Sequence, residues 1–365
     1  MGEHRVALVP AGVTALKKAK LEVKVQKGAG EAAGFSDQTY VDAGASLAES
    51  PTDLATCDVV VGIWAFAPQS ASQIAVALFD PLWEINAAAV STKATLFSLD
   101  LVPRTTRAQA MDVLSSQANL AGYMGVLLGA AELPKILPMM TTAAGTLAPA
   151  RVLILGAGVA GLQAIATARR LGAVVSAYDV RPAVKEQIES LGARFVELPI
   201  EAEAAQDSGG YAKAMGEEFY AKQRQLLGDV HAEVDLVITT ALVPGMKAPI
   251  LVTEAMASRM APGSVIVDLA AERGGNCELT KPGETVLHKG VKIVGPLNLA
   301  SRLATHASQL FSKNVQTFLL NIVKDGALSL NEEDPIVSGS MFARGGEVVH
   351  PQVRKKMNLP EVASE

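Results

Sequence analysis

The sequence predicts an α/β protein of two Rossmann-like, doubly wound domains, each with a parallel sheet, separated by a cleft. Short apolar runs alternate with helix-forming segments along most of the chain, and no hairpin signals separate them. This alternation is typical of parallel sheets. One apolar run leads directly into a glycine-rich turn at residues 156–161. At 365 residues the chain is long enough for two domains of ordinary size.

The N-terminal elements follow this alternation. Residues 5–9 predict a strand or its end, and the continuous apolar run at residues 57–63 predicts a buried strand. The other elements expected here are helices at 11–19 and 37–43, an edge strand at 21–26, and a strand–helix–strand unit at 76–79, 83–90 and 95–101.

The rest of the chain divides into a connecting helix, a second domain and a return segment. Residues 119–140 are the most apolar long stretch, but Glu132, Pro134 and Lys135 interrupt it, so it predicts a buried helix and not a membrane span. The expected first domain combines residues 1–115 and 300–365, with an apolar-periodic helix at 303–323 returning the chain to it. Residues 116–140 connect to a second domain at 141–299, with strands near 152–155, 174–178, 235–239, 264–268 and 291–294.

The glycine turn has the spacing of a dinucleotide-binding βαβ unit. Gly156, Gly158 and Gly161 follow the strand at 152–155 and open a helix-forming segment. The first glycine permits a tight turn, the second lets backbone N–H groups approach a pyrophosphate, and the third allows close packing of helix on strand. The helix N-terminus adds partial positive charge. A purely structural strand–turn–helix is the alternative.

Asp179 closes the second strand of this unit, roughly 20 positions beyond the glycines. A carboxylate there accepts hydrogen bonds from the adenosine ribose and repels a 2′-phosphate, which favours NAD(H) over NADP(H). Arg181, two residues on, would soften that preference. A solvated carboxylate at a strand end is the alternative for Asp179.

The densest polar cluster outside the fingerprint is residues 104–117, after the strand that ends near Pro103. Polar side chains at this edge of an α/β sheet lie where ligands usually bind. If the segment after Arg107 is helical, Gln109, Asp112 and Ser115 share one face. Such a stripe would orient a nicotinamide by hydrogen bonds; the alternative is a helix cap followed by a wet helix face.

Three other segments are weaker candidates. Residues 239–245 and 268–276 follow predicted strands of the second domain, and a glycine pair in the latter permits close backbone approach to a ligand or only a tight turn. Residues 201–227 are polar and predict a long excursion with some helix, which fits either a lid or a solvated helical hairpin.

Composition excludes several classes of function. Aromatic residues are only 4% and the net charge is −5, so the stacking surfaces and basic patches of nucleic-acid binding are absent from the sequence. Cys57 and Cys277 suggest two buried thiols in a reducing compartment. The five histidines are scattered, so no metal site is predicted. No apolar run follows Met1–Arg5, so a signal peptide is not expected and a soluble chain is.

Four segments together resemble the NAD(H)-binding α component (α1, or domain I) of proton-translocating NAD(P)+ transhydrogenases. They are Gly156–Ala168, Arg104–Gln117, Gly209–Phe219 and Val348–Pro351. The resemblance extends over nearly the whole chain. The cluster at residues 104–117 is specific to that family, whereas the glycine fingerprint is not.

The resemblance implies roles for individual residues. One loop would hold the nicotinamide end, face the NADP(H)-binding component and carry the catalytic positions; it contributes Arg104, Thr105, Thr106, Gln109, Asp112 and Ser115, with Gln109 reaching toward the partner nucleotide. Val159 and the glycine turn (Gly156, Gly158, Gly161) would contact the pyrophosphate. Other NAD(H) contacts would come from Asp179, Val180 and Arg181 at the ribose, from Gly210, Tyr211 and Met215 in a mobile loop, and from Leu242 at the adenine.

The resemblance also implies partners. The family's NAD(H) component is a homodimer that docks onto an NADP(H)-binding component and a membrane-spanning subunit, at the cytoplasmic side of the inner or plasma membrane. The first domain would face the partner and form the dimer. Hydride would pass between two nicotinamides with Si–Re stereospecificity, which needs no general acid. Family members usually carry a further strand before the segment where this chain starts, so the first sheet is expected to lack a strand, and membrane helices are expected on another polypeptide.

Two other functions remain open. Alanine dehydrogenases share this fold and the Arg5–Pro10 pattern, but carry a substrate-handling lysine in the strand aligned with residues 59–68 and a histidine near residues 76–81. Neither residue is present here, which disfavours amino-acid oxidation. A non-catalytic NAD(H) sensor would share the fingerprint and lack any turnover.

Overall fold

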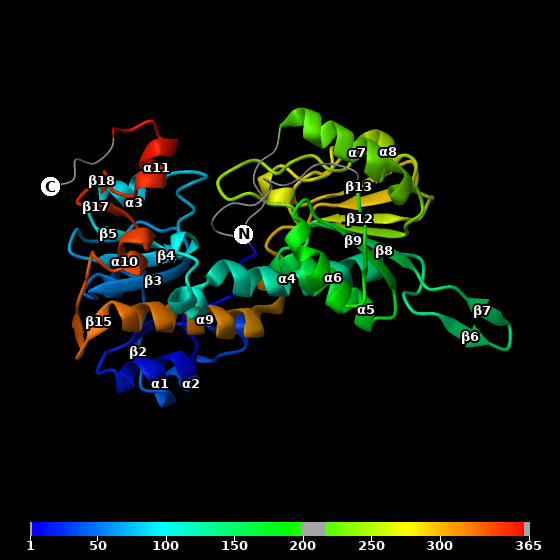
Figure 1. The fold of residues 1–365 in the computed structure, drawn as a ribbon. Coiled ribbons are helices and arrows are strands. Elements are labelled where there is room, and N and C mark those ends of the chain that lie inside the picture. Colours follow the sequence, from blue (N-terminus) through cyan, green and yellow to red (C-terminus); the bar gives the residue numbers. More distant parts are fainter. Residues whose placement is uncertain (1, 199–215, 361–365) are drawn as a thin grey trace. The chain divides into compact units, whose positions relative to one another are not determined.

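The computed structural model describes residues 2–198 and 216–360. The chain divides into two compact units: unit 1 comprises Met1–Gln117 and Ser301–Glu365, and unit 2 comprises Ala118–Ala300. Figure 1 labels the elements of both. Both units are α/β, with parallel strands at the centre of each main sheet.

Unit 1 is built around a five-stranded sheet of order β18-β17-β5-β4-β3. Strands β3, β4 and β5 are parallel, whereas β17 runs antiparallel to both β5 and β18. The bounds of the strands are β1 (Lys24–Gln26), β2 (Ser46–Ala48), β3 (Val59–Trp64), β4 (Ile74–Leu78), β5 (Thr95–Ser98), β15 (Val323–Lys324), β16 (Ala327–Leu328), β17 (Met341–Arg344) and β18 (Glu347–Val348). The C-terminal segment thus completes the sheet of the N-terminal one.

Helices cover both faces of that sheet. The α-helices are α1 (Pro10–Lys18), α2 (Asp37–Asp42), α3 (Ala87–Ser91), the start of α4 (Val113–Glu132), α9 (Ala304–Asn321), α10 (Pro335–Ser340) and α11 (Pro351–Lys356), with 3₁₀ helices η1 (Glu31–Ala33), η2 (Pro51–Leu54), η3 (Leu99–Leu101) and η4 (Thr106–Met111). Alternate residues of β4 face opposite sides: Val76 packs in the cluster that includes Phe311 of α9, and Ala75 in the cluster that includes Ala89 of α3.

Unit 2 contains a seven-stranded sheet of order β10-β9-β8-β11-β12-β14-β13, parallel except for the edge strand β13. Its elements are β6 (Met140–Thr142), β7 (Gly145–Leu147), β8 (Arg151–Leu155), α5 (Val159–Arg170), β9 (Val174–Tyr178), η5 (Pro182–Val184), α6 (Lys185–Ser190), β10 (Arg194–Phe195), α7 (Glu217–Ala232), β11 (Leu236–Thr239), α8 (Glu254–Ala257), β12 (Val265–Asp268), η6 (Ala271–Arg273), β13 (Thr285–His288), β14 (Val291–Val294) and, where the chain returns to unit 1, η7 (Leu299–Leu303).

The period of two along each strand explains why this sheet is doubly wound. Val152 and Ile154 of β8 belong to one buried cluster, which includes residues of α4, α5 and α6. Leu153 and Leu155 belong to another, which includes residues of α7 and α8. Burial on both faces is what a continuous run of Val, Ile and Leu predicts for a central parallel strand. The five strands predicted for this domain are all present.

Three expected elements differ from the structure. Residues 5–9 are not a strand, although Val6 and Val9 are buried. Instead, the backbone N–H groups of Val6 and Val9 donate to the hydroxyls of Ser308 and Ser312 on α9, at 2.9 and 3.1 Å. The strand expected at residues 57–63 is an edge strand and mostly half-buried. The helix expected at 119–140 begins earlier and ends at Glu132, because Pro134 has no N–H for the helix ladder.

The segment after that proline forms an exposed hairpin. Strands β6 and β7 pair antiparallel and all six of their residues are exposed. In Figure 1 they extend as a two-stranded arm from the rest of unit 2. Met139, Met140 and Leu147 are 65%, 44% and 53% exposed, so the arm presents apolar side chains to its surroundings.

Candidate functional site

The glycine turn of unit 2 begins where β8 ends. Gly156 has a φ of +97°, in the left-handed region that glycine adopts without strain. A Cβ at Gly156 would lie 2.7 Å from Thr240 Oγ1, and one at Gly161 would lie 1.9 Å from the Gly156 carbonyl oxygen. Among the described residues, nothing lies within 4 Å of a Cβ built on Gly158. The first and third glycines therefore allow close packing, and the second leaves room at the N-terminus of α5.

This turn lies at the topological switch point of the sheet. Strands β8, β9 and β10 follow one another in one direction and β11, β12 and β14 in the other, so the order reverses between β8 and β11. Doubly wound proteins bind ligands outside the carboxyl ends of their strands at such a point. Thr240, directly after β11, donates from Oγ1 to the Gly156 carbonyl oxygen at 3.0 Å. The sequence analysis did not single out Thr240, whose only local signal is its place at a strand end.

Asp179 is buried at the end of β9, and its carboxylate holds the glycine turn. Its Oδ2 accepts from the Ala157 backbone N–H at 2.7 Å, and its Oδ1 accepts from the Arg181 backbone N–H at 2.8 Å. The Arg181 guanidinium donates through Nε to Oδ1 and through Nη2 to Oδ2, both at 2.8 Å. With 7% of its surface exposed, Asp179 is not the solvated carboxylate that was the alternative.

A second buried carboxylate supports the neighbouring strand ends. Asp268, fully buried at the end of β12, accepts from Thr239 Oγ1 at 2.9 Å, from Thr280 Oγ1 at 2.6 Å and from the Asn276 backbone N–H at 2.7 Å. The Asn276 side chain bonds both the N–H and the carbonyl of Ala241, at 3.0 and 2.9 Å. These residues form the scaffold of the loop that follows β11.

The remaining unit 2 candidates surround the same strand ends. Val159 opens α5 and is 37% exposed, and Leu242 lies 41% exposed on the loop after β11. Val180 is half-buried beside Asp179. The candidates Gly210, Tyr211 and Met215 lie outside the residues that the structure describes.

The candidate loop of unit 1 follows β5 and η3. Arg104, Thr105 and Thr106 are exposed, and so is Gln109 on η4. Ala108 and Met111 of the same 3₁₀ helix are buried in the unit 1 core, which anchors η4 while its polar side chains face outward.

The expected helix face that joins Gln109, Asp112 and Ser115 is wrong. Asp112 has a ψ of 89°, so the backbone leaves the helical conformation between η4 and α4. The Asp112 carboxylate accepts from the Ser115 backbone N–H at 2.8 Å and from Ser115 Oγ at 2.6 Å. A carboxylate that bonds the third N–H of a helix is an N-cap. Asp112 and Ser115 therefore start α4, as the alternative of a helix cap predicts.

A residue that the sequence analysis missed ties this loop to the unit 1 core. Asn314 of α9 donates from Nδ2 to the Ala110 carbonyl at 2.8 Å and accepts at Oδ1 from Ser116 Oγ at 2.8 Å. It thereby spans the junction of η4 and α4. About two hundred positions separate the partners in sequence, so no local pattern indicates the contact.

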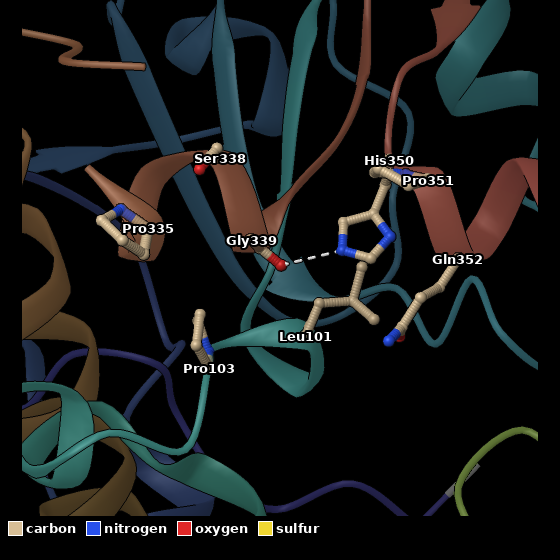
Figure 2. A pocket seen from close by; sticks show the side chains of 8 residues that line it. All are labelled: Leu101, Pro103, Pro335, Ser338, Gly339, His350, Pro351 and Gln352. Atoms are coloured by element: carbon tan, nitrogen blue, oxygen red, sulfur yellow. Dashed lines mark hydrogen bonds between the residues drawn. The ribbon is translucent and has the colours of Figure 1, made fainter. Parts of the chain in front are cut away.

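Unit 1 also contains a cavity of about 500 Å³, shown in Figure 2. It is lined by Leu101, Pro103, Pro335, Ser338, Gly339, His350, Pro351 and Gln352. His350 Nε2 lies 3.1 Å from the Gly339 carbonyl, the dashed contact in the figure. Its Nδ1 is buried without a hydrogen-bond partner among the described residues, and burial lowers the pKa of His350. Of the predicted site residues that the structure describes, none lines this cavity.

The two cysteines are free thiols. Cys277 is buried, and burial raises its pKa to about 12, so it stays protonated at neutral pH. Cys57 is only half-buried, so the expectation of two buried thiols holds for Cys277 alone.

Neither a membrane span nor a metal cluster is found in residues 2–198 and 216–360. Within these ranges, no helix is both long and apolar enough to cross a membrane. In the same stretches of the chain, no group of three or more His, Cys, Asp or Glu side chains is placed to hold a metal ion.

Comparison with known proteins covers the whole chain. Residues 1–121 match the family "Alanine dehydrogenase/PNT, N-terminal domain", and residues 125–351 match "Alanine dehydrogenase/PNT, C-terminal domain". The first of the separate chains that make up the NAD(P) transhydrogenase subunit alpha of Rhodospirillum rubrum is 47% identical, covering 96% of this chain and 95% of that protein. The alanine dehydrogenase of Methanococcus maripaludis is 27% identical, covering 100% of this chain and 95% of that protein.

Solved structures give the same result. The transhydrogenase from Sinorhizobium meliloti superimposes with a TM-score of 0.84 at 45% identity, covering 95% of this chain and 97% of that one. An L-alanine dehydrogenase has a TM-score of 0.80 at 26% identity, covering 98% and 96%. The chain therefore belongs to the alanine dehydrogenase/PNT family, among the relatives of the NAD(P) transhydrogenase alpha subunits.

Proposed function

We propose that this chain is the NAD(H)-binding component of a proton-translocating transhydrogenase of the Si–Re type, in which hydride passes between NADH here and NADP+ on a partner component. The observation that carries the proposal is the glycine turn at the switch point of the unit 2 sheet, with a buried carboxylate at the end of the neighbouring strand. This combination is typical of dinucleotide sites. Family membership supports an oxidoreductase that uses a nicotinamide nucleotide.

The described residues fit the adenosine and pyrophosphate part of NAD(H). The open space at Gly158 and the N-terminus of α5, a helix of 12 residues, favour the pyrophosphate. Asp179 offers a carboxylate to the ribose and disfavours a 2′-phosphate. Gly156 and Gly161 shape the turn, and the proposed contacts also include Val159, Val180, Arg181 and Leu242, with Gly210, Tyr211 and Met215 outside the described residues.

The unit 1 loop is proposed to orient the reacting nicotinamide. NADH supplies a hydride from C4 of its nicotinamide, and the hydride leaves with its electron pair to C4 of the NADP+ nicotinamide, so no proton needs a carrier. The exposed Gln109 amide both donates and accepts hydrogen bonds. Arg104, Thr105 and Thr106 border it. Asp112 and Ser115 bond to each other, so their proposed part is to hold η4 against the start of α4.

We also propose the assembly. The chain would form a homodimer and dock at the cytoplasmic side of a membrane, onto an NADP(H)-binding component and a membrane-spanning subunit; no nucleic acid takes part. Relatives named subunit alpha support a multi-subunit enzyme. The exposed apolar side chains of the β6–β7 arm in unit 2 support a dimer contact there, in addition to the unit 1 contact that the resemblance implies.

The test is hydride transfer from NADH to an NADP+ analogue, with and without a soluble NADP(H)-binding partner component. A parallel reaction replaces the partner with pyruvate and ammonium. Turnover that requires the partner is the expected result. Turnover with pyruvate and ammonium would instead assign the chain to alanine oxidation, the activity named for its more distant relatives. NADH binding without turnover in either reaction would favour a sensor.

A further inference from the structure

The carboxylate proposed to receive the ribose has all of its acceptor positions occupied. A carboxylate has two oxygens with about four lone-pair sites. Two sites of Asp179 accept from the backbone N–H groups of Ala157 and Arg181, at 2.7 and 2.8 Å. The other two accept from Nε and Nη2 of the Arg181 side chain, both at 2.8 Å. A ribose diol therefore has to displace one of these donors.

The Arg181 side chain is the donor that can leave. The Ala157 N–H belongs to the glycine turn and the Arg181 N–H follows directly from the fold of β9, so neither can move without unfolding that strand end. The guanidinium, by contrast, sits at the end of a flexible stem. The paired side chains of Arg181 and Asp179 are 12% and 5% exposed, so water screens their attraction only weakly.

We propose that Arg181 sets the nucleotide selectivity of this site as the internal counter-ion of Asp179. This inference rests on the proposed function and goes further in assigning the selectivity to one residue. Arg181 competes with the ribose diol for Asp179, which weakens NADH. It also neutralises the negative charge that would repel a 2′-phosphate, which lessens the penalty on NADPH. Both effects reduce the preference for NADH over NADPH.

The test compares the dissociation constants of NADH and NADPH for three variants of the full chain, by nucleotide fluorescence or calorimetry. Arg181→Met keeps an unbranched apolar stem and removes the charge and the donors. Arg181→Gln keeps a donor without the charge. Lys185→Met is the matched control, because Lys185 is an exposed cation close by that pairs with Glu197 and not with Asp179.

The expected result for Arg181→Met is tighter NADH binding and a rise of about tenfold in the ratio of NADPH to NADH dissociation constants. Arg181→Gln raises the ratio through the charge effect, and Lys185→Met leaves it unchanged. Because Arg181→Met leaves a buried carboxylate without its cation, melting of the nucleotide-free protein is measured alongside. If that variant does not fold, Arg181→Gln decides the test by the same ratio.

The opposite outcomes are distinct. A ratio that is unchanged or lower in the folded variants, or weaker NADH binding, would mean that Arg181 contacts the nucleotide directly, and the inference would fail. A wild-type chain that binds neither nucleotide would overturn the proposed function itself. The result for Arg181 is thereby separate from the result for the dinucleotide site.

Discussion

Gly158 and Gly161 lie on the same turn, but the structure predicts different consequences for an added methyl group. At Gly161 a Cβ would lie 1.9 Å from the Gly156 carbonyl oxygen, so α5 must shift away from β8. At Gly158 the φ of −73° suits alanine and the described surroundings leave the Cβ unobstructed. We expect Gly161→Ala to lower the melting temperature of the nucleotide-free protein. Gly158→Ala should keep that temperature and weaken NADH binding, because the methyl group occupies the space proposed for the pyrophosphate.

Calorimetric melting and NADH titration of the two variants, side by side, check this expectation. Equal loss of stability in both would show that the glycine at 158 is needed for folding. Full NADH affinity in a folded Gly158→Ala variant would remove the pyrophosphate from this turn.

His231 makes the stability of unit 2 sensitive to acid. It is fully buried on α7, its Nε2 has no hydrogen-bond partner in the described part of the chain, and burial lowers its pKa from 6.5 to about 4. Above pH 6.5 the histidine is neutral in both the folded and unfolded states. As the pH falls from 6.5 toward 4, the unfolded state binds a proton that the folded state excludes, so stability decreases.

A pKa difference of this size corresponds to a loss of about 2 kcal/mol between pH 7 and pH 5. His231→Phe fills a similar volume and does not titrate, so its stability should change less over this interval. Calorimetry of both proteins at the two pH values measures the difference. His288→Phe is the control, since that side chain is less buried and bonds Ser258 at 2.9 Å. An identical pH dependence of wild type and His231→Phe would show that His231 does not cause the effect.

At the scale of elements, η4 presents Gln109 from a rigid base. Ala108 and Met111 anchor it in the core, and Asn314 holds the following carbonyl. Gln109→Asn shortens the side chain by one methylene and keeps the amide, so it withdraws the amide from its proposed position without disturbing the anchor. We expect slower hydride transfer with the partner component and nearly unchanged NADH affinity.

Single-turnover transfer and NADH titration test this expectation. Gln38→Asn on α2 is a matched control, because Gln38 is also exposed and its amide bonds Asp42 within its own helix. A large loss of NADH affinity in Gln109→Asn would place Gln109 in nucleotide binding and remove it from the transfer step.

How far elements are predictable from sequence depends on where their hydrogen bonds go. Central strands such as β8 and β11 are buried on both faces, so continuous apolar runs indicate them directly. Residues 5–9 have the same composition, but their N–H groups bond serine hydroxyls about three hundred positions away. The cap at Asp112 was foreseen only as an alternative, because Asp and Ser at that spacing fit both a helix face and a helix start.

At the scale of the whole molecule, the α/β class follows from alternation, but the order of strands does not. The switch point between β8 and β11 depends on long-range pairing that no local pattern encodes. The β13–β14 hairpin also escaped prediction. Its turn residues Lys289 and Gly290 both have positive φ, 49° and 84°, a conformation usually indicated by Asn-Gly or Asp-Gly. The candidate site was predictable as far as the glycine fingerprint and Asp179, whereas Thr240 and Asn314 act through tertiary contacts.

The β6–β7 arm tests the proposed homodimer without touching the nucleotide site. Met139 and Leu147 expose 65% and 53% of their surface, which is unusual for large apolar side chains in a folded chain that has no partner. Met139→Ser combined with Leu147→Ser should shift the protein from dimer to monomer in light scattering and leave NADH affinity intact. Leu287→Ser is the control, because Leu287 is 71% exposed on the edge strand β13 and lies outside the arm. A dimer that persists in the double variant would mean that the contact lies elsewhere, for example on unit 1, as the resemblance implies. A monomer produced by Leu287→Ser would transfer the contact to the edge of the sheet.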